Sequence, residues 1–283
     1  MNFSHYLYGA SLAALVTIAQ PTIVRSYEST QINDTANNIT VRIDINAGSS
    51  GQGSGVIIAR DGSTYYVLTS NHVVKHLDYQ YDIVTPDGEK YLTDPSTITK
   101  VGDVDLAVIA FESDLSYKVA QIESSEARIR QGTPMYVNGF PEAGRQVKDG
   151  PQFTSGIITG INEGHCWGYN LVYDNVTKRG MSGGPILNEQ GKLIGIHGLA
   201  EQERLANDDN LNGCQTDNNN EDSPKKREKI DLNLGISIAT FLEHVKSIGM
   251  EQILDTATTN RLTRPTVINT TPDADAGCSG VCN

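Results

Sequence analysis

The sequence is short of cysteine, of basic residues and of long hydrophobic runs. Four cysteines among 283 residues are too few for a small fold that depends on disulfides. The 22 lysines and arginines are outnumbered by 34 acidic residues, and the formal net charge is −12. This excludes a general binder of nucleic acid or anionic membranes, because such partners need a basic surface. Hydrophobic residues still make up 38% of the chain, too many for a disordered protein and enough for a core.

Only one hydrophobic run is long, and it lies at the N-terminus. Residues 6–18 are mostly apolar, and Thr17 and Ala19 place small residues at the −3 and −1 positions of a cleavage site. No Lys or Arg precedes the run, and residues 6–24 could instead stay as a membrane anchor. Pro21 interrupts the run. We therefore expect a signal peptide and a secreted or periplasmic protein, with membrane anchoring as the alternative.

An exported chain can form disulfides, and four cysteines allow three pairings. We expect Cys166 to pair with Cys214, and Cys278 to pair with Cys282, where a short loop would tie off the C-terminal tail. Four free thiols are the alternative. The cysteines do not form two matching C-x₂-C pairs, so the sequence does not predict a zinc site. We expect no metal and no cofactor at the functional site.

Short apolar segments separated by turn residues dominate the chain after residue 50. Gly55–Ala59 and Tyr65–Thr69 flank an Asp-Gly turn and are typical of a β-hairpin. Turns at such short intervals favour a sandwich or barrel over βαβ units. The other predicted strands are Asp82–Thr85, Leu106–Phe111, Pro134–Asn138, Ser155–Ile161, Leu171–Tyr173, Pro185–Leu187, Leu193–Gly198 and Leu234–Ile238.

One helix and two polar segments complete the pattern. A helix is predicted from Thr240 to Gly249, because residues 241, 245 and 248 are apolar and share a face. Residues 201–229 are rich in Asn and Asp and indicate a surface loop. A calcium site in this loop is an alternative, although the spacing of an EF-hand is absent. The segment from about residue 256 is a polar tail.

The glycine-rich segment 179–185, Arg-Gly-Met-Ser-Gly-Gly-Pro, contains a candidate nucleophile in Ser182. A serine hydroxyl attacks only when a base takes its proton, and the resulting oxyanion needs backbone N–H donors. Gly180, two residues before the serine, leaves the turn unobstructed. Gly180 and Ser182 are therefore candidate oxyanion-hole donors. A glycine-rich turn with an incidental serine is the alternative.

Two further candidates lie at strand ends. His72 follows the predicted strand Tyr65–Thr69, and a base at the end of a rigid strand keeps its ring in place. Asp105 opens the predicted strand Leu106–Phe111, where a carboxylate can hold the imidazole tautomer and stabilise its charged form. Together with Ser182, these two residues form a candidate triad in a β-type context.

The three candidate residues lie in three short sequence blocks that resemble those of a known family. The blocks are Leu-Thr-Ser-Asn-His-Val-Val at 68–74, Asp-Val-Asp-Leu-Ala-Val-Ile at 103–109 and Gly-Met-Ser-Gly-Gly-Pro at 180–185. Over roughly residues 53–249 the sequence resembles the chymotrypsin-fold serine proteases. The resemblance implies two perpendicular six-stranded antiparallel β-barrels with the active site in the cleft between them. It also implies His72 as general base, Asp105 as its orienter and Ser182 as the nucleophile that forms an acyl-enzyme. The family pattern favours Asp105 over the alternative Asp103.

The sequence departs from the digestive enzymes at two points, and in both it is similar to the bacterial branch of this family. Met181 stands before the serine, where the digestive enzymes carry an aspartate that pairs with a newly freed N-terminal amine. Met181 cannot form that ion pair. No cysteine flanks His72, so the disulfide next to the histidine is missing as well.

The offsets from Ser182 also indicate a substrate pocket. Val176 replaces the aspartate with which trypsin-like enzymes bind Lys or Arg, so we expect no basic P1 preference. Thr177 and His197, five residues before and fifteen after the serine, are similar to the pocket of bacterial glutamyl endopeptidases. A hydroxyl and an imidazole can supply the donors that a buried P1 carboxylate needs, and a charged imidazole would make specificity depend on pH. A nonspecific protease is the alternative.

We therefore expect an all-β, secreted serine endopeptidase that acts as a monomer on proteins or peptides, without cofactor, nucleic acid or stable membrane partner. An inactive homologue that acts as a binding protein is one alternative. An α/β-hydrolase is another, on the Gly-x-Ser-x-Gly match, but its acid and histidine would have to follow the serine. The predicted order is a signal peptide at 1–19, an N-terminal segment or propeptide at 20–47, a first barrel at 48–125, a second barrel at 126–255 with the inserted loop 201–229, and a tail at 256–283.

Overall fold

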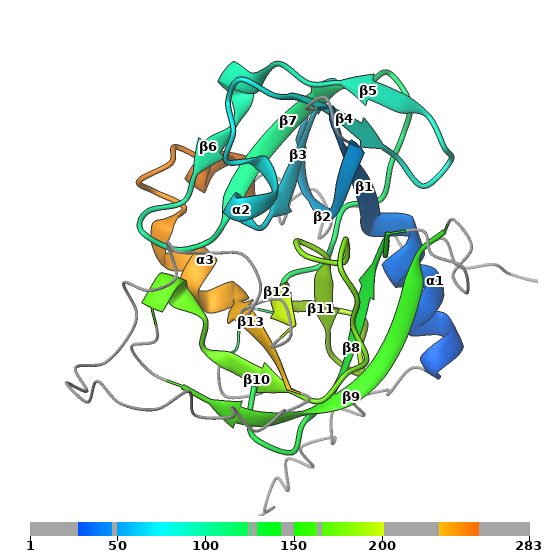
Figure 1. Cartoon of the computed structure of the whole chain (residues 1–283), viewed down its shortest axis with the longest axis vertical. Coiled ribbons are helices and arrows are strands. Elements are labelled where there is room, and N and C mark those ends of the chain that lie inside the picture. Colours follow the sequence, from blue (N-terminus) through cyan, green and yellow to red (C-terminus); the bar gives the residue numbers. More distant parts are fainter. Residues whose placement is uncertain are drawn as a thin grey trace, which may run out of the picture.

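The computed structural model describes residues 28–46, 50–123, 125, 129–142, 150–162, 166–200 and 232–254. In this part of the chain, a seven-stranded antiparallel sheet lies against a closed antiparallel barrel of six strands (Figure 1). The predicted all-β fold is confirmed. The predicted signal peptide, loop 201–229, tail and disulfides lie outside the described residues; of the four cysteines only the backbone of Cys166 is described. None of the described helices is long and apolar enough to cross a membrane.

The first sheet runs in the order β5-β4-β1-β2-β3-β7-β6. The predicted hairpin is present as β2 and β3, with Gly62 at φ +59° in the turn. The resemblance implied six strands closed into a barrel, whereas this sheet has seven strands in an open order. Its two end strands have only three and two residues, which leaves little backbone for a closing ladder. The strands are β1 Thr40–Asn46, β2 Ser50–Asp61, β3 Thr64–Thr69, β4 Gln80–Val84, β5 Lys90–Leu92, β6 Thr99–Lys100 and β7 Ala107–Glu112.

The second sheet closes on itself in the order β10-β13-β12-β11-β8-β9, as predicted for the C-terminal barrel. Each of its strands was predicted from an apolar segment between turn residues. The strands are β8 Pro134–Gly139, β9 Gln152–Ile161, β10 Leu171–Tyr173, β11 Pro185–Leu187, β12 Leu193–Ala200 and β13 Asn233–Ser237.

The described helices are short. The predicted C-terminal helix is α3 Ile238–His244, which begins where the Ser237 side chain accepts a hydrogen bond from the Thr240 N–H. It ends five residues before Gly249, because tight turns replace the last predicted turn of helix. Two helices were not predicted, α1 Ser29–Ile39 and the single turn α2 Asn71–Val74; two 3₁₀ turns are η1 Pro95–Thr97 and η3 Cys166–Gly168.

The chain upstream of residue 48 is part of the fold. The prediction starts the first barrel at residue 48, but β1 already pairs with β2 on one side and β4 on the other. In α1, Ile32, Ala36 and Ile39 lie on one face and are buried. The segment 28–46 therefore supplies both a central strand and a helix that packs at the junction of sheet and barrel (Figure 1).

Three apolar clusters hold these elements together. In β2, Ile57 faces the interior of the first sheet, whereas Val56 and Ile58 face the barrel, because successive side chains point to opposite faces. In β12, Ile194 faces the interior of the barrel, whereas Leu193 lies in the same apolar cluster as Val56 and Ile58. The largest cluster thus lies between the two sheets, where α1 and α3 close its opposite ends (Figure 1). This cluster fixes the relative position of the strand ends that carry the candidate site.

Candidate active site

His72 and Asp105 lie side by side. His72 is on α2, the single helical turn that leaves β3, and Asp105 stands just before β7, the neighbour of β3. The His72 Nδ1 atom is 2.6 Å from Asp105 Oδ2, and the His72 backbone N–H donates to Asp105 Oδ1 over 2.8 Å. Two contacts from one residue fix both oxygens of the carboxylate. Nδ1 must carry a hydrogen for this arrangement, so in the neutral ring Nε2 is the nitrogen that can act as a base.

The environment keeps Asp105 ionised. Burial by itself raises the pKa of this carboxyl. The charge of His72, its hydrogen bonds and a hydrogen bond from Tyr169 outweigh burial and hold the pKa of Asp105 below its ordinary value. A buried carboxylate beside an imidazole stabilises the imidazolium that forms when the ring accepts a proton.

Tyr169 is a site residue that the sequence did not reveal. Its buried hydroxyl donates to Asp105 Oδ2, and the Asp105 N–H donates to the Trp167 carbonyl over 2.9 Å. Trp167 has φ +60°, the single positive φ of a non-glycine residue in the described chain. A side chain at Gly198 would overlap the Tyr169 ring, with its Cβ 2.1 Å from Cε1. The barrel thus reaches over Asp105 and caps it.

Ser182 lies in the turn before β11, at the junction of the two sheets. Its carbonyl accepts from the Ser54 N–H over 2.8 Å. The next N–H, that of Gly183, donates to the His197 carbonyl over 2.7 Å, and Ser70 Oγ donates to the same carbonyl over 3.2 Å. The segment that leads into His72 and the segment that carries Ser182 therefore meet on one acceptor. The structure brings the three predicted triad residues into one region.

Two backbone N–H groups at this turn are unused. Gly180 has φ +92°, a conformation that favours glycine. The Glu142 N–H donates to the Arg179 carbonyl over 2.8 Å, which orients the peptide between Arg179 and Gly180. Within the described residues, neither the Gly180 N–H nor the Ser182 N–H has a hydrogen-bond partner. These are the two donors predicted for an oxyanion hole.

Met181 replaces an ionic anchor with an apolar one. Its side chain is fully buried and packs in the core of the barrel with Met135, Val137 and Ile194. The residue before the candidate nucleophile is thus held by packing, in agreement with the inference that it forms no ion pair.

His197 is buried inside the barrel and is neutral. Burial, followed by the nearby charge of His72, lowers the pKa of His197 to about 3. The charged imidazole that would make specificity depend on pH is therefore disfavoured by burial in the free protein at neutral pH. His197 Nδ1 is 2.5 Å from the Tyr173 hydroxyl, which also lies 3.2 Å from the Leu234 carbonyl. The Tyr173 hydroxyl has one proton and can donate it to either acceptor; the ring proton lies on Nε2 when the hydroxyl donates to Nδ1, and on Nδ1 when the hydroxyl donates to Leu234. Nε2 has no hydrogen bond within the described residues.

Thr177 is already engaged. Its hydroxyl donates to Asn233 Oδ1 over 2.5 Å, and the Asn233 amide donates to the Asn175 carbonyl over 2.5 Å. Val176, in contrast, is 68% exposed. The structure links Thr177 to β13, the strand that pairs with β12 and hence with His197, but it shows no direct contact between the two predicted pocket residues. Among the described residues, no cluster of His, Cys, Asp or Glu could hold a metal ion.

The comparisons with known proteins agree with this arrangement. Residues 53–196, about half of the chain, match the family described as "Trypsin-like peptidase domain". The chain belongs to the trypsin-like peptidase family. The matched range contains all three candidate triad residues and the first four residues of β12.

Curated relatives within this family are named serine proteases. The chain is 30% identical over 165 residues to the Serine protease Do-like HtrA of Bacillus subtilis, a match that covers 54% of this chain and 34% of that protein. It is 29% identical over 200 residues to the Serine endoprotease DegS of Haemophilus influenzae, covering 65% and 51%. The chain thus spans between a third and a half of the length of these relatives.

A solved structure shares the fold. The HtrA-type protease AlgW with tripeptide is similar to this chain with a TM-score of 0.58 and 23% sequence identity. The match covers 80% of this chain and 64% of that one. The trypsin-like peptidase fold therefore extends over most of the described chain.

Proposed function

We propose that this chain is a serine endopeptidase with His72, Asp105 and Ser182 as its catalytic triad. The observation that carries the proposal is the His72 Nδ1 to Asp105 Oδ2 contact of 2.6 Å, next to a serine turn with two unused N–H groups. The family membership and the names of the relatives support the same reaction class. An inactive homologue would have no need to keep all of these groups in one place.

The reaction follows from the roles of these groups. His72 Nε2 takes the hydroxyl proton of Ser182 as Oγ bonds to the scissile carbonyl carbon, and the N–H groups of Gly180 and Ser182 stabilise the oxyanion. The C–N bond then breaks, His72 returns the proton to the leaving amine, and the acyl-enzyme remains. A water molecule, deprotonated by His72, releases the acid and restores Ser182.

Within this function we propose a preference for an acidic P1 residue. In the tautomer whose Nδ1 accepts from Tyr173, His197 offers a proton on Nε2 in a buried setting, where a donor to a carboxylate is worth more than in water. The carboxylate would bind a neutral imidazole and draw the Thr177 hydroxyl away from Asn233. Val176 supplies no charge for a basic side chain. The proposal thus rests on neutral donors and needs no charged histidine.

The triad is tested by Ser182→Ala. The purified wild-type protein should cleave an unfolded protein substrate, and Ser182→Ala should show no cleavage. Ser113→Ala, which removes another buried serine hydroxyl from the first sheet, is the matched control and should keep full activity. Retained activity in Ser182→Ala would overturn the triad, and an inactive wild-type protein would favour the binding-protein alternative.

The pocket is tested with a peptide library varied at P1. We expect enrichment of Glu, with Gln at least about tenfold poorer in kcat/KM, because the charged hydrogen bonds are lost. His197→Asn should remove most of this ratio. A flat P1 profile in the wild-type protein, or a Glu to Gln ratio that His197→Asn leaves unchanged, contradicts the acidic preference while leaving the triad intact.

We also propose that the protein works outside the cytoplasm. The predicted signal peptide supports this, as does the relative named Periplasmic serine endoprotease DegP of Salmonella typhimurium, which is 31% identical over 54% of this chain. The mature protein, purified from the secreted or periplasmic fraction, should begin near Gln20 and no later than Glu28 on N-terminal sequencing, because α1 and β1 are part of the fold. Recovery of the whole protein in the cytoplasm with Met1 in place would contradict export.

A further inference from the structure

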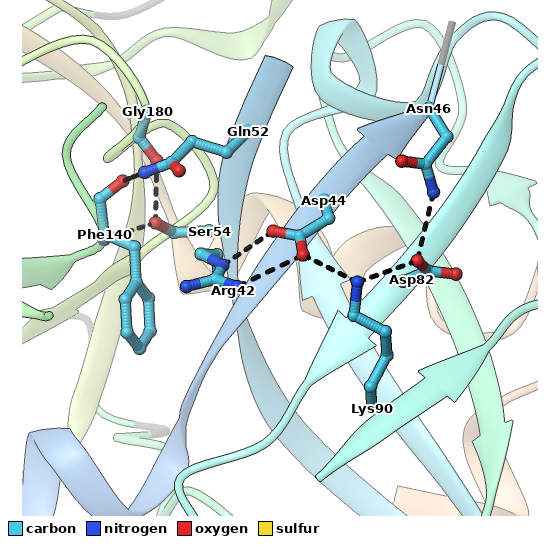
Figure 2. Close-up of polar contacts among 9 residues, drawn as sticks. All are labelled: Arg42, Asp44, Asn46, Gln52, Ser54, Asp82, Lys90, Phe140 and Gly180. Atoms are coloured by element: carbon cyan, nitrogen blue, oxygen red, sulfur yellow. Dashed lines mark hydrogen bonds and ion pairs between the residues drawn. The ribbon is translucent and has the colours of Figure 1, made fainter. Parts of the chain in front are cut away.

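The three residues after β8, Phe140, Pro141 and Glu142, are held from the first sheet. Gln52 and Ser54 are alternate residues of β2 and so lie on the same face of that strand. Gln52 Nε2 donates to the Phe140 carbonyl over 2.9 Å, and the Phe140 N–H donates to Ser54 Oγ over 2.8 Å (Figure 2). One peptide segment of the barrel is thus fixed at both its carbonyl and its N–H by a strand of the other sheet.

The same serine continues into the turn that carries the nucleophile. Ser54 Oγ donates to the Gly180 carbonyl over 2.8 Å (Figure 2). The Ser54 N–H donates to the Ser182 carbonyl over the same distance. Ser54 is fully buried, so these bonds do not compete with solvent. One residue of β2 therefore touches the turn on both sides of Met181.

The held segment also grips the peptide before Gly180. The Glu142 N–H donates to the Arg179 carbonyl, and a Cβ on Gly180 would lie 2.6 Å from the Phe140 carbonyl oxygen. Because the peptide group is planar and trans, fixing the Arg179 carbonyl also fixes the direction of the Gly180 N–H. The two contacts thus restrict the Gly180 N–H to one orientation. In that orientation it has no hydrogen-bond partner within the described chain.

The close approach depends on Gly139. A Cβ there would lie 2.9 Å from Met181 Cα and 3.0 Å from Ser54 Oγ, so no side chain fits between β2, the end of β8 and the turn. Met181 supplies only apolar packing. On the Gly180 side of Met181, directional bonds therefore come from Ser54 and from the segment that Gln52 and Ser54 hold, in addition to the bond between the Gly183 N–H and the His197 carbonyl on the other side.

We propose that Ser54 and Gln52 are positioning residues that preform the oxyanion hole from the opposite sheet. The inference rests on the proposed function, since it assigns these residues to the same reaction. Their hydrogen bonds to this region go to the backbone of Phe140, Gly180 and Ser182 and not to the Ser182 hydroxyl. They act through the orientation of the Gly180 N–H, and so they matter more for the transition state than for the bound substrate.

The test is the split between kcat and KM. Ser54→Ala should lower kcat about tenfold and leave KM within about twofold, because the lost interaction matters in the transition state. A peptidyl trifluoromethyl ketone, whose hemiketal oxyanion occupies the hole, should bind about tenfold more weakly. Thr93→Val is the matched control: it removes an equally buried hydroxyl, which bonds to Tyr81, from the far end of the same sheet. It should leave both values unchanged.

Gln52→Met keeps the test decisive if Ser54→Ala does not fold. Gln52 is partly exposed, and Met fills a similar volume without an amide, so this variant should fold and lose about threefold in kcat at constant KM. Wild-type kcat and ketone affinity in folded Ser54→Ala, or in Gln52→Met where the first variant does not fold, would overturn the inference. A failure of the proposed function is distinct, because it appears as retained activity in Ser182→Ala.

Discussion

The open first sheet and the closed barrel carry different parts of the site. The sheet has free edges and an aromatic core, in which Tyr65 stacks on Phe111 with ring centroids 5.2 Å apart. Its candidate catalytic residues stand where strands end, at His72 and Asp105. The barrel has no edge, and it buries polar side chains such as His197 inside the ring, where each hydrogen bond has a fixed direction.

This difference matches the positional precision that each part of the reaction requires. A base on a short helical turn needs one hydrogen bond to set its tautomer, whereas an oxyanion hole and a carboxylate pocket need several donors aimed at one point. The closed ladder supplies the more rigid frame for the second task. Substitutions in the barrel should therefore lower activity or stability more than substitutions at the edge of the sheet.

The largest effect is expected for Gly180→Ala in the barrel. The new Cβ would lie 2.6 Å from the Phe140 oxygen at a backbone with φ +92°, so the turn must move and the Gly180 N–H with it. We expect kcat to fall about 10²- to 10³-fold, the usual effect of losing one oxyanion donor. Gly191→Ala is the control, since Gly191 also has positive φ but a Cβ there would make only ordinary contacts with Thr35, at 3.5 Å or more. Equal losses in the two variants would show that backbone strain alone, and not the turn, controls the rate.

The next effect concerns stability in acid and also lies in the barrel. The folded-state pKa of His197, about 3, is below the value of about 6.5 expected in an unfolded chain. The unfolded state therefore takes up a proton first, and the stability that this histidine contributes is complete above about pH 6.5 and lost as the pH falls toward 3. We expect a loss on the order of 1 kcal/mol per pH unit in this window. Urea unfolding at several pH values should show a smaller slope in His197→Asn; equal slopes would contradict a buried neutral histidine.

Tyr169→Phe tests the contact in which the barrel caps the carboxylate of the sheet. Loss of the donor destabilises the Asp105 anion, so the His72–Asp105 pair should bind its proton more tightly. The acid limb of the kcat/KM profile should move to higher pH, and the plateau should fall about tenfold. Tyr65→Phe removes another hydroxyl, which bonds to the Leu115 carbonyl in the first sheet, and should leave the profile unchanged. A profile in Tyr169→Phe that matches this control would remove Tyr169 from the site.

The smallest effect is expected at the open edge of the sheet. Lys90 on β5 bridges Asp44 and Asp82 at 3.2 and 3.1 Å, and Arg42 and Asn46 complete the network (Figure 2). The Lys90 side chain is about half exposed, so Lys90→Met should cost less than about 1 kcal/mol, and less still at high salt. Lys118→Met, at an exposed lysine without an ion pair in the described chain, should cost nothing measurable. If Lys90→Met lowered the free energy of unfolding by several kcal/mol, the open edge would be as sensitive to substitution as the barrel.

Much of the fold could be predicted because strand signals are local. The ten predicted strands are present, since alternation and turn residues are properties of a few consecutive residues. Strands β5 and β6 are too short and too exposed to leave such a pattern. The helix α1 consists mostly of polar residues with modest helix propensity, and burial of Ile32, Ala36 and Ile39 against the core is what stabilises it. β1 does alternate, but its place in the middle of the sheet depends on partners far along the chain.

The sequence by itself determined the residue types, their order and their offsets from Ser182, and these were enough to propose the reaction and the pocket. Only the tertiary structure decided that Tyr169 caps Asp105, that Ser54 holds the turn at Gly180 and that His197 is buried and neutral. The first two contacts join residues 64 and 126 positions apart. Their partners are set by closure of the barrel and by packing of one sheet on the other, which no local pattern encodes. The neutral state of His197 has the same origin, because burial rather than sequence position sets the free energy of its charged form.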